Sequence, residues 1–305
     1  QAVGDSRHPL YYLIISSITN VVLDILLIAV FKMDVDGAAL ATIISQFVSV
    51  FLCMGRLMNP VSGECQVKWR EVRFDPEMTR MILSYGLPSG LQNSVIALAN
   101  VVVQSNINSF GEMAMSGCGA YAKVEGFAFL PITSFTSAIT TFVGQNLGAG
   151  NYRRLQRGVV QITCAAGVVT LLIGLVATVF CRPLLGLFSS DPAVLDAAVR
   201  YTWWVLPFIW TYAVFNCMMS FVNGTGAVKY TTVVNLLILW AVRIPAAYIL
   251  HALGYGTSSM VCVSLSYAVG LVAMLGYFLT PEWGKLRRKA KELGDAVTAE
   301  TEPTL

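Results

Sequence analysis

Charged side chains are scarce in this sequence. Only 12% of its 305 residues are Asp, Glu, Lys or Arg, whereas 56% are hydrophobic. A soluble domain has about 25% charged residues, which cover its surface in water. The net charge of +3 is also too small to indicate a nucleic-acid partner. These deficits exclude an ordinary soluble enzyme, a disordered chain and a secreted disulfide scaffold, and they indicate a protein embedded in a lipid bilayer.

Patterns for metal binding and catalysis are missing as well. The two histidines, His8 and His251, lie in different segments, and the seven cysteines include no CxxC pair. Without an HExxH pattern, a membrane-embedded zinc enzyme is not indicated. The cysteines are expected to be small buried hydrophobes. We therefore expect no enzymatic activity, no metal and no cofactor.

Eight long apolar runs make up most of the sequence. A bilayer core about 30 Å thick needs about 20 apolar residues of helix, whereas barrel strands would be about 10 residues long and alternating. We therefore predict an all-α integral membrane protein with eight transmembrane helices. Pro88 and Pro131 interrupt two of the longer runs, where kinks or exposed ends are expected. The runs cover roughly residues 10–30, 37–57, 81–110, 114–147, 159–180, 201–222, 231–250 and 257–280.

The basic residues give these spans an orientation. If the N-terminus is cytoplasmic, 15 of the 20 Lys and Arg residues fall in cytoplasmic segments and three in outer ones. Lys123 and Arg243 lie within spans. This asymmetry is a strong positive-inside signal. We expect a multi-pass protein of the cell (inner) membrane with both termini in the cytoplasm.

A weak internal repeat relates the first two spans to the last two. Val3-Gly4-Asp5-Ser6 and the spans after it resemble Asn223-Gly224-Thr225-Gly226 and its following spans, at a shift of about 220 residues. Four spans precede the second copy and none precedes the first. We therefore expect a parent of about 450 residues with twelve helices in two parallel-repeat six-helix lobes, and no transport by residues 1–305 alone.

The repeat divides the chain into four parts. Residues 1–57 would be the remainder of the N-lobe, with its last two helices. Residues 58–77 are polar and read as a cytoplasmic linker between lobes. Residues 78–280 would form the six-helix C-lobe, and residues 281–305 a basic and polar cytoplasmic tail.

Asp24 is the only charged residue of its span. An ionisable group at bilayer depth costs at least about 2.5–3.5 kcal/mol, so that it needs a reason. Asn20 lies one helical turn earlier, and Thr42 lies at a similar depth on the next span. A carboxylate, an amide and a hydroxyl at one depth can bind a proton or Na⁺, which makes Asp24, Asn20 and Thr42 the candidate ion-coupling site. The alternative is an Asp24 that Asn20 and the backbone satisfy and that only holds helices together.

Polar residues in other spans indicate a second site. Glu125 follows Tyr121 by one turn, and the span with Gln92 and Asn93 carries six amides. So many amides favour a wet cavity, although each alone is better explained as an interhelical hydrogen bond. A Glu125–Arg243 pair would be structural rather than part of a substrate site. The candidate cavity residues are Gln92, Asn93, Tyr121, Glu125 and Asn216.

Several motifs resemble those of the multidrug and toxic compound extrusion (MATE) transporters. The segment FVGQNLGAGNYRR at 142–154 looks like the cytoplasmic end of that family's eighth helix, and GLPSGLQ at 86–92 resembles its seventh. The Gly224/Gly226 turn and Arg243-Ile244-Pro245 resemble the eleventh-helix region. The chain would then hold family helices five to twelve. The candidate ion-coupling residues match polar positions of the ion site in the DinF-like branch.

This resemblance implies an exporter. Entry of H⁺ or Na⁺ would drive efflux of small organic, often cationic, compounds by alternating access of two lobes, in a monomer that needs no other cofactor. The alternative is a flippase for lipid-linked oligosaccharides, which shares the broader fold. A flippase would need a large basic cavity for pyrophosphate. Only Lys123 and Arg243 supply cations within the spans, which favours the exporter.

Overall fold

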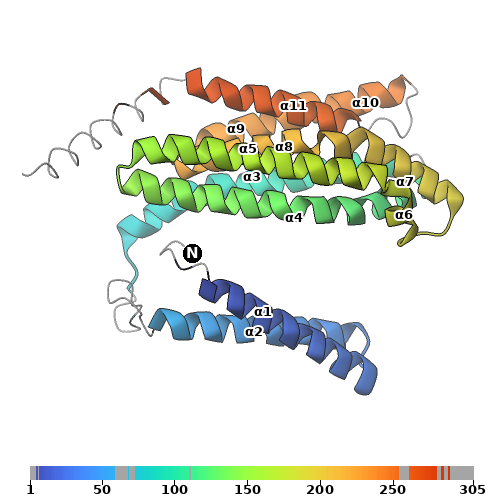
Figure 1. The fold of residues 1–305 in the computed structure, drawn as a ribbon, viewed down its shortest axis with the longest axis horizontal. Helices are drawn as coiled ribbons and strands as arrows, with labels where there is room; N and C mark the ends of the chain where they lie inside the picture. The colour runs from blue at the N-terminus through green and yellow to red at the C-terminus, as the bar shows by residue number, and fades with distance from the viewer. Residues whose placement is uncertain are drawn as a thin grey trace, which may run out of the picture. The chain divides into compact units, whose positions relative to one another are not determined.

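The computed structural model describes residues 5, 7–58, 68, 73–109, 111–253, 261–279, 283–284 and 288. Within this part of the chain the secondary structure is helical, without a strand, which confirms the predicted all-α class. The contacts of the chain divide it into two compact units, Gln1–Thr79 and Arg80–Leu305 (Figure 1).

The first unit is a helical hairpin. Helix α1 (Arg7–Asp24) continues into a π-helical segment η1 (Ile25–Val30), and a short loop leads to α2 (Val35–Met58). The loop folds closely onto the start of α2, because a Cβ on Gly37 would lie 2.8 Å from the Cβ of Met33. Across the hairpin, the Ser16 hydroxyl donates a 2.7 Å hydrogen bond to the Ser45 carbonyl. Small and hydroxyl side chains thus hold the pair together, as is common between helices in lipid.

In the described residues, the second unit holds six spans, of which five are helices long and apolar enough to cross a membrane and the sixth is the shorter apolar helix α11 (Figure 1). The first three spans are the long helices α3, α4 and α5. The fourth is built from α7, a 3₁₀ segment η4 and α8, and the fifth from α9, a π-helical segment η5 and α10. The elements are α3 (Pro76–Asn108), α4 (Glu112–Gly148), α5 (Tyr152–Val179), α6 (Cys181–Gly186), α7 (Pro192–Val205), η4 (Leu206–Phe208), α8 (Ile209–Gly224), α9 (Val228–Leu237), η5 (Ile238–Arg243), α10 (Ile244–Ala252), α11 (Val261–Gly276) and η7 (Tyr277–Leu279).

All eight predicted apolar runs are helical in the described residues. Seven helices are long and apolar enough to cross a membrane, and α11, with 16 residues, is a shorter apolar helix. The fourth span of the second unit begins at Pro192, earlier than predicted. Asp191 causes this early start, since its side chain accepts a 2.9 Å hydrogen bond from the Ala193 backbone and caps α7. Pro88 and Pro131 lie inside α3 and α4, which continue past them.

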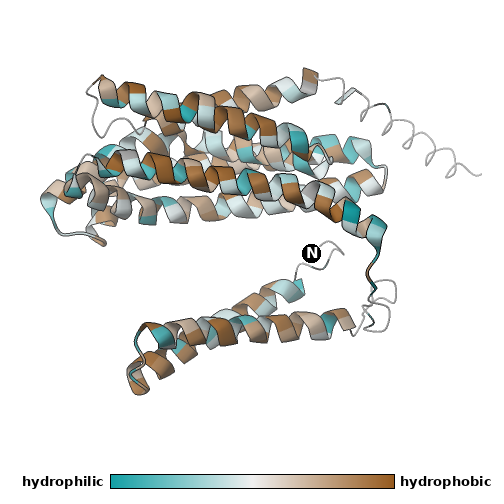
Figure 2. Cartoon of the chain, turned by 180° about the vertical axis from the view of Figure 1, so that it is seen from behind, coloured by the Kyte–Doolittle hydropathy of each residue, from teal (hydrophilic) through white to brown (hydrophobic). Residues whose placement is uncertain are grey.

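Helix α4 packs against α5, α7 and α8 in the second unit. Small residues permit this close packing. A Cβ on Gly117 of α4 would lie 2.8 Å from the Cβ of Ala197 on α7. Elsewhere the helices expose large apolar side chains, as Leu172, Val176 and Val179 do on α5, and hydrophobic residues cover much of the outer ribbon (Figure 2). An apolar exterior around a packed interior is what contact with lipid requires.

Candidate functional site

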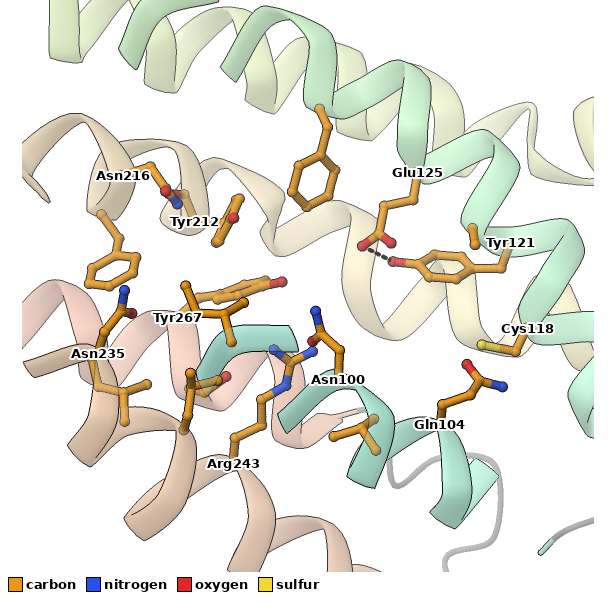
Figure 3. Close-up of a pocket in the computed structure, with 18 of the residues that line it drawn as sticks. Asn100, Gln104, Cys118, Tyr121, Glu125, Tyr212, Asn216, Asn235, Arg243 and Tyr267 are labelled. Carbon is orange, nitrogen blue, oxygen red and sulfur yellow. Dashed lines mark hydrogen bonds between the residues drawn. The ribbon is translucent and has the colours of Figure 1, made fainter. Parts of the chain in front are cut away.

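The second unit contains a polar cavity with a volume of about 320 Å³ (Figure 3). Side chains from α3, α4, α8, α9 with η5, and α11 line it, so that five of the unit's six spans contribute. Ligand pockets commonly start at about 300 Å³, and this cavity therefore suits a small molecule. Its polar lining residues include Asn100, Gln104, Tyr121, Glu125, Tyr212, Asn216, Asn235, Arg243, Ser266 and Tyr267.

Glu125 and Tyr121 form one wall of the cavity. They lie one turn apart on α4, and the Tyr121 hydroxyl donates a 2.6 Å hydrogen bond to Glu125 Oε1 (Figure 3). The length is typical of a hydroxyl bonded to a carboxylate. Tyr121 is only 2% exposed, so that its ring is fixed in the core. The i, i+4 spacing in the sequence predicted this proximity.

Arg243 enters the cavity from the opposite side (Figure 3). It is the last residue of the π-helical segment η5, and Pro245 follows two residues later. Proline has no N–H, so that a carbonyl one turn earlier loses its helical donor and a wide turn is tolerated there. The Nε atom of Arg243 is buried and has no hydrogen-bond partner among the described residues. The cavity lining thus leaves this nitrogen of the guanidinium without an acceptor.

The structural pair between Glu125 and Arg243 that the sequence favoured is not found. In the part of the chain that the structure describes, no ion pair joins the two side chains, although both line the same cavity. Glu125 instead takes its hydrogen bond from its own helix. A carboxyl group and a guanidinium group therefore face the cavity without contacting each other.

Aromatic rings form much of the remaining lining. The rings of Tyr212 on α8 and Tyr267 on α11 have centroids 4.3 Å apart, and those of Phe129 on α4 and Tyr212 are 5.0 Å apart. Tilted contacts at these distances are favourable. The rings join three helices and offer apolar faces beside the polar groups.

The structure separates the predicted amides into two groups. Asn216 lines the cavity, where its Nδ2 donates a 2.9 Å hydrogen bond to the Tyr212 carbonyl. Gln104 also lines it and donates to Asn108 on its own helix at 2.9 Å. Gln92 is buried and Asn93 is exposed, and neither is part of the lining. Of the five candidate cavity residues, Tyr121, Glu125 and Asn216 are thus brought together.

The sequence interpretation missed other lining residues, among them Asn235, Ser266 and the ring pair. Asn235 lies about two turns before Arg243 in one span, and that spacing on one helix face was an available signal. Ser266 and Tyr267 sit in an apolar run without any such pattern. Lys123, two residues before Glu125, is exposed and lies outside the lining, as its different helix face predicts.

The candidate ion-coupling residues lie in the first unit. Asn20 Nδ2 and Asp24 Oδ1 are both buried, and neither has a hydrogen-bond partner in the part of the chain that the structure describes. Thr42 is exposed, and its hydroxyl donates a 3.0 Å hydrogen bond to the Ala38 carbonyl on its own helix. Asn20 and Asp24 thus carry unmet polar atoms on one helix, whereas Thr42 is satisfied within another. The described residues hold no group of three or more His, Cys, Asp or Glu side chains suited to a metal.

Fold and cavity together define a multi-pass membrane protein with a small polar chamber between its spans. The MatE family matches residues 88–249, more than half of the chain and all but one of the spans that line the cavity. The chain belongs to this family, which confirms the prediction from the motifs.

Relatives extend the likeness to nearly the whole chain. It is 29% identical over 294 residues to the probable multidrug resistance protein YpnP of Bacillus subtilis, covering 94% of the chain and 64% of YpnP. It is 25% identical over 310 residues to the probable multidrug resistance protein NorM of Thermotoga maritima, covering 96% and 65%. A solved structure of the Vibrio cholerae MATE transporter VcmN matches with a TM-score of 0.80 at 22% identity, covering 95% and 64%, and supports the fold alone. The chain thus spans just under two thirds of the length of these relatives.

Proposed function

We propose that the chain forms part of a secondary active exporter, which moves small organic, often cationic, compounds out of the cell in exchange for H⁺ or Na⁺. The observation that carries this proposal is the cavity of the second unit, where Glu125 and Arg243 lie between spans without pairing. Ionisable groups in spans are costly and mark pathways for polar solutes. The two relatives named as probable multidrug resistance proteins support the same activity.

The shape and charge of the cavity argue against a lipid-linked oligosaccharide as the cargo. Its volume is about 320 Å³, and Arg243 is the one cation in a described lining that also carries Glu125. The pyrophosphate would need several cations, and the attached oligosaccharide would need much more space than this cavity has. Export of a small compound therefore fits better than lipid flipping.

Asp24 is our candidate for the residue that binds the coupling ion. Its Oδ1 and the Nδ2 of Asn20 are buried without partners among the described residues, and an unsatisfied buried polar atom costs about 1–3 kcal/mol. A proton or Na⁺ would supply the contact that Asp24 Oδ1 lacks, and a water molecule that enters with Na⁺ would accept from Asn20 Nδ2. The Thr42 hydroxyl donates its proton to the Ala38 carbonyl. Thr42 would therefore belong to the ion site only if a lone pair of its hydroxyl oxygen coordinates the ion. This assignment follows the DinF-like branch of the family.

The setting of the exporter is also part of the proposal. The segment 1–305 would belong to a twelve-helix monomer in the cell (inner) membrane, with both ends of the chain in the cytoplasm. The excess of basic residues in alternate connecting segments supports this orientation.

Transport in lipid vesicles tests the proposal. The full twelve-helix protein would be reconstituted, and H⁺ and Na⁺ gradients would be imposed separately on vesicles with a fluorescent organic cation. We expect efflux with one of the two gradients, its loss in Asp24→Asn, and no change in Lys123→Gln, which removes an exposed charge outside the cavity. Absence of efflux under either gradient would refute the exporter, and unchanged coupling in Asp24→Asn would refute the role of Asp24.

A further inference from the structure

The cavity of the second unit presents two opposite charges that its own residues leave unpaired. Glu125 lies on α4 and Arg243 on η5, and no ion pair joins them in the residues that the structure describes. A structural ion pair would bring the two groups into contact. Their separation across a chamber instead leaves both available to something that enters it.

Arg243 is less well satisfied by the cavity lining than Glu125, which accepts a hydrogen bond from Tyr121. The Arg243 Nε is buried and finds no hydrogen-bond acceptor among the residues that the structure describes, and its side chain points into the chamber (Figure 3). A guanidinium presents its donors in a planar fork that matches a carboxylate, which can accept two parallel hydrogen bonds. The chemistry of this wall is therefore that of a carboxylate subsite.

Glu125 favours a ligand group of the opposite charge to the one that Arg243 favours. Its Oε1 accepts from Tyr121, and its charge attracts a ligand cation. A ligand with a single charge would meet one favourable and one unfavourable wall, because Arg243 repels an ammonium and Glu125 repels a carboxylate. A ligand that carries both charges complements both walls.

The rest of the lining indicates the body of such a ligand. Tyr212 and Tyr267 hold rings 4.3 Å apart, and Phe129 packs on Tyr212 at 5.0 Å. Aromatic faces of this kind pack well against another flat ring. The volume of about 320 Å³ limits the ligand to a small molecule.

We propose that the cavity binds small aromatic zwitterions, with the ligand carboxylate at Arg243 and the ligand ammonium at Glu125. Export of such a ligand rests on the proposed function. Its binding does not, since binding needs no ion gradient. The chamber lies wholly within the second unit.

Three indole compounds test the ligand class in equilibrium dialysis against the full chain in lipid nanodiscs. Tryptophan carries both charges, tryptamine carries the ammonium alone, and indolepropionate carries the carboxylate alone. We expect tryptophan to bind about tenfold more tightly than either, because each charge-assisted contact is worth a factor of about ten or more.

Variants assign each contact. Arg243→Gln should remove the preference for tryptophan over tryptamine, and Glu125→Gln should remove its preference over indolepropionate. Arg243→Lys keeps the charge without the planar fork and should weaken tryptophan binding less than Arg243→Gln. Lys123→Gln is the matched control and should change none of the three affinities. Circular dichroism and gel filtration would check that each variant folds.

The outcomes separate this inference from the export function. Equal affinities of wild-type protein for tryptophan and tryptamine, or binding of none of the compounds, would overturn the inference even if no variant folded. A preference for tryptophan that persists in both Arg243→Gln and Glu125→Gln would overturn it as well. Tryptophan binding as expected, together with no efflux under any gradient, would instead leave the ligand class standing and refute the exporter.

Discussion

Gly174 allows α5 to pack against the bend between α7 and α8. A Cβ built on Gly174 would lie 2.4 Å from the Leu206 carbonyl oxygen and 3.0 Å from Cγ2 of Ile209. Leu206 is 0% and Ile209 1% exposed, so that neither has space to move into. Overpacking of this kind costs about 1–3 kcal/mol. Since the closest atom is backbone rather than a flexible side chain, Gly174→Ala should fall near the upper end of that range.

Gly144→Ala is the matched control for Gly174→Ala. Both glycines lie in long helices, but a Cβ on Gly144 would meet no atom within 4 Å. Each substitution gains up to about 1 kcal/mol of helix propensity, and this gain cancels in the comparison. We expect the free energy of unfolding in mixed detergent micelles, followed by circular dichroism, to be about 1–3 kcal/mol lower for Gly174→Ala than for Gly144→Ala. Equal values would refute the close approach of α5 to the bend.

Three further substitutions test separate parts of the structure. Tyr121→Phe removes the donor to Glu125 and should lower the free energy of unfolding by about 1–3 kcal/mol, measured against Tyr248→Phe, whose ring is exposed; equal losses would contradict the role of the hydrogen bond. Asp5 caps α1 and contacts His8, which lowers the pKa of the Asp5 carboxyl from 3.8 to about 2. Because a depressed pKa stabilises the folded state above the unfolded-state value, this contribution should be lost as the pH falls from about 4 to about 2. The wild type should therefore lose stability over this interval relative to Asp5→Asn, and parallel curves would refute the contact. The Arg182–Asp196 ion pair is exposed on both sides, so that Arg182→Ala should change the free energy of unfolding by less than about 1 kcal/mol; a larger loss would mean a buried role.

The spans could be predicted from the sequence because lipid imposes a simple rule. A helix that crosses a bilayer must be apolar over its length, and residues 10–30 or 159–180 meet this rule without any tertiary information. The contact between Tyr121 and Glu125 could be predicted for a similar reason, since i, i+4 spacing depends only on helix geometry.

Residues brought together by different helices could not be predicted. In a soluble helix the polar face points outward, but in lipid the exposed face is also apolar, so that periodicity does not show which side of a span faces its neighbours. For this reason the sequence favoured Gln92 on α3, whereas Asn100, eight residues later on the same helix, lines the cavity. Tyr212 and Tyr267 were missed because their contact depends on how α8 packs against α11.

The two π-helical segments connect the internal repeat to the charges in the spans. Each lies in the first span of its copy, η1 after α1 and η5 after α9. Asp24 directly precedes η1, and Arg243 is the last residue of η5; both carry a buried polar atom without a partner. A π turn adds a residue to the helix and redirects the side chains around it, and such turns are frequent at functional sites. The weak sequence repeat thus corresponds to a shared backbone feature beside opposite charges, and this supports separate roles for the two copies, with a cation at Asp24 and a carboxylate at Arg243.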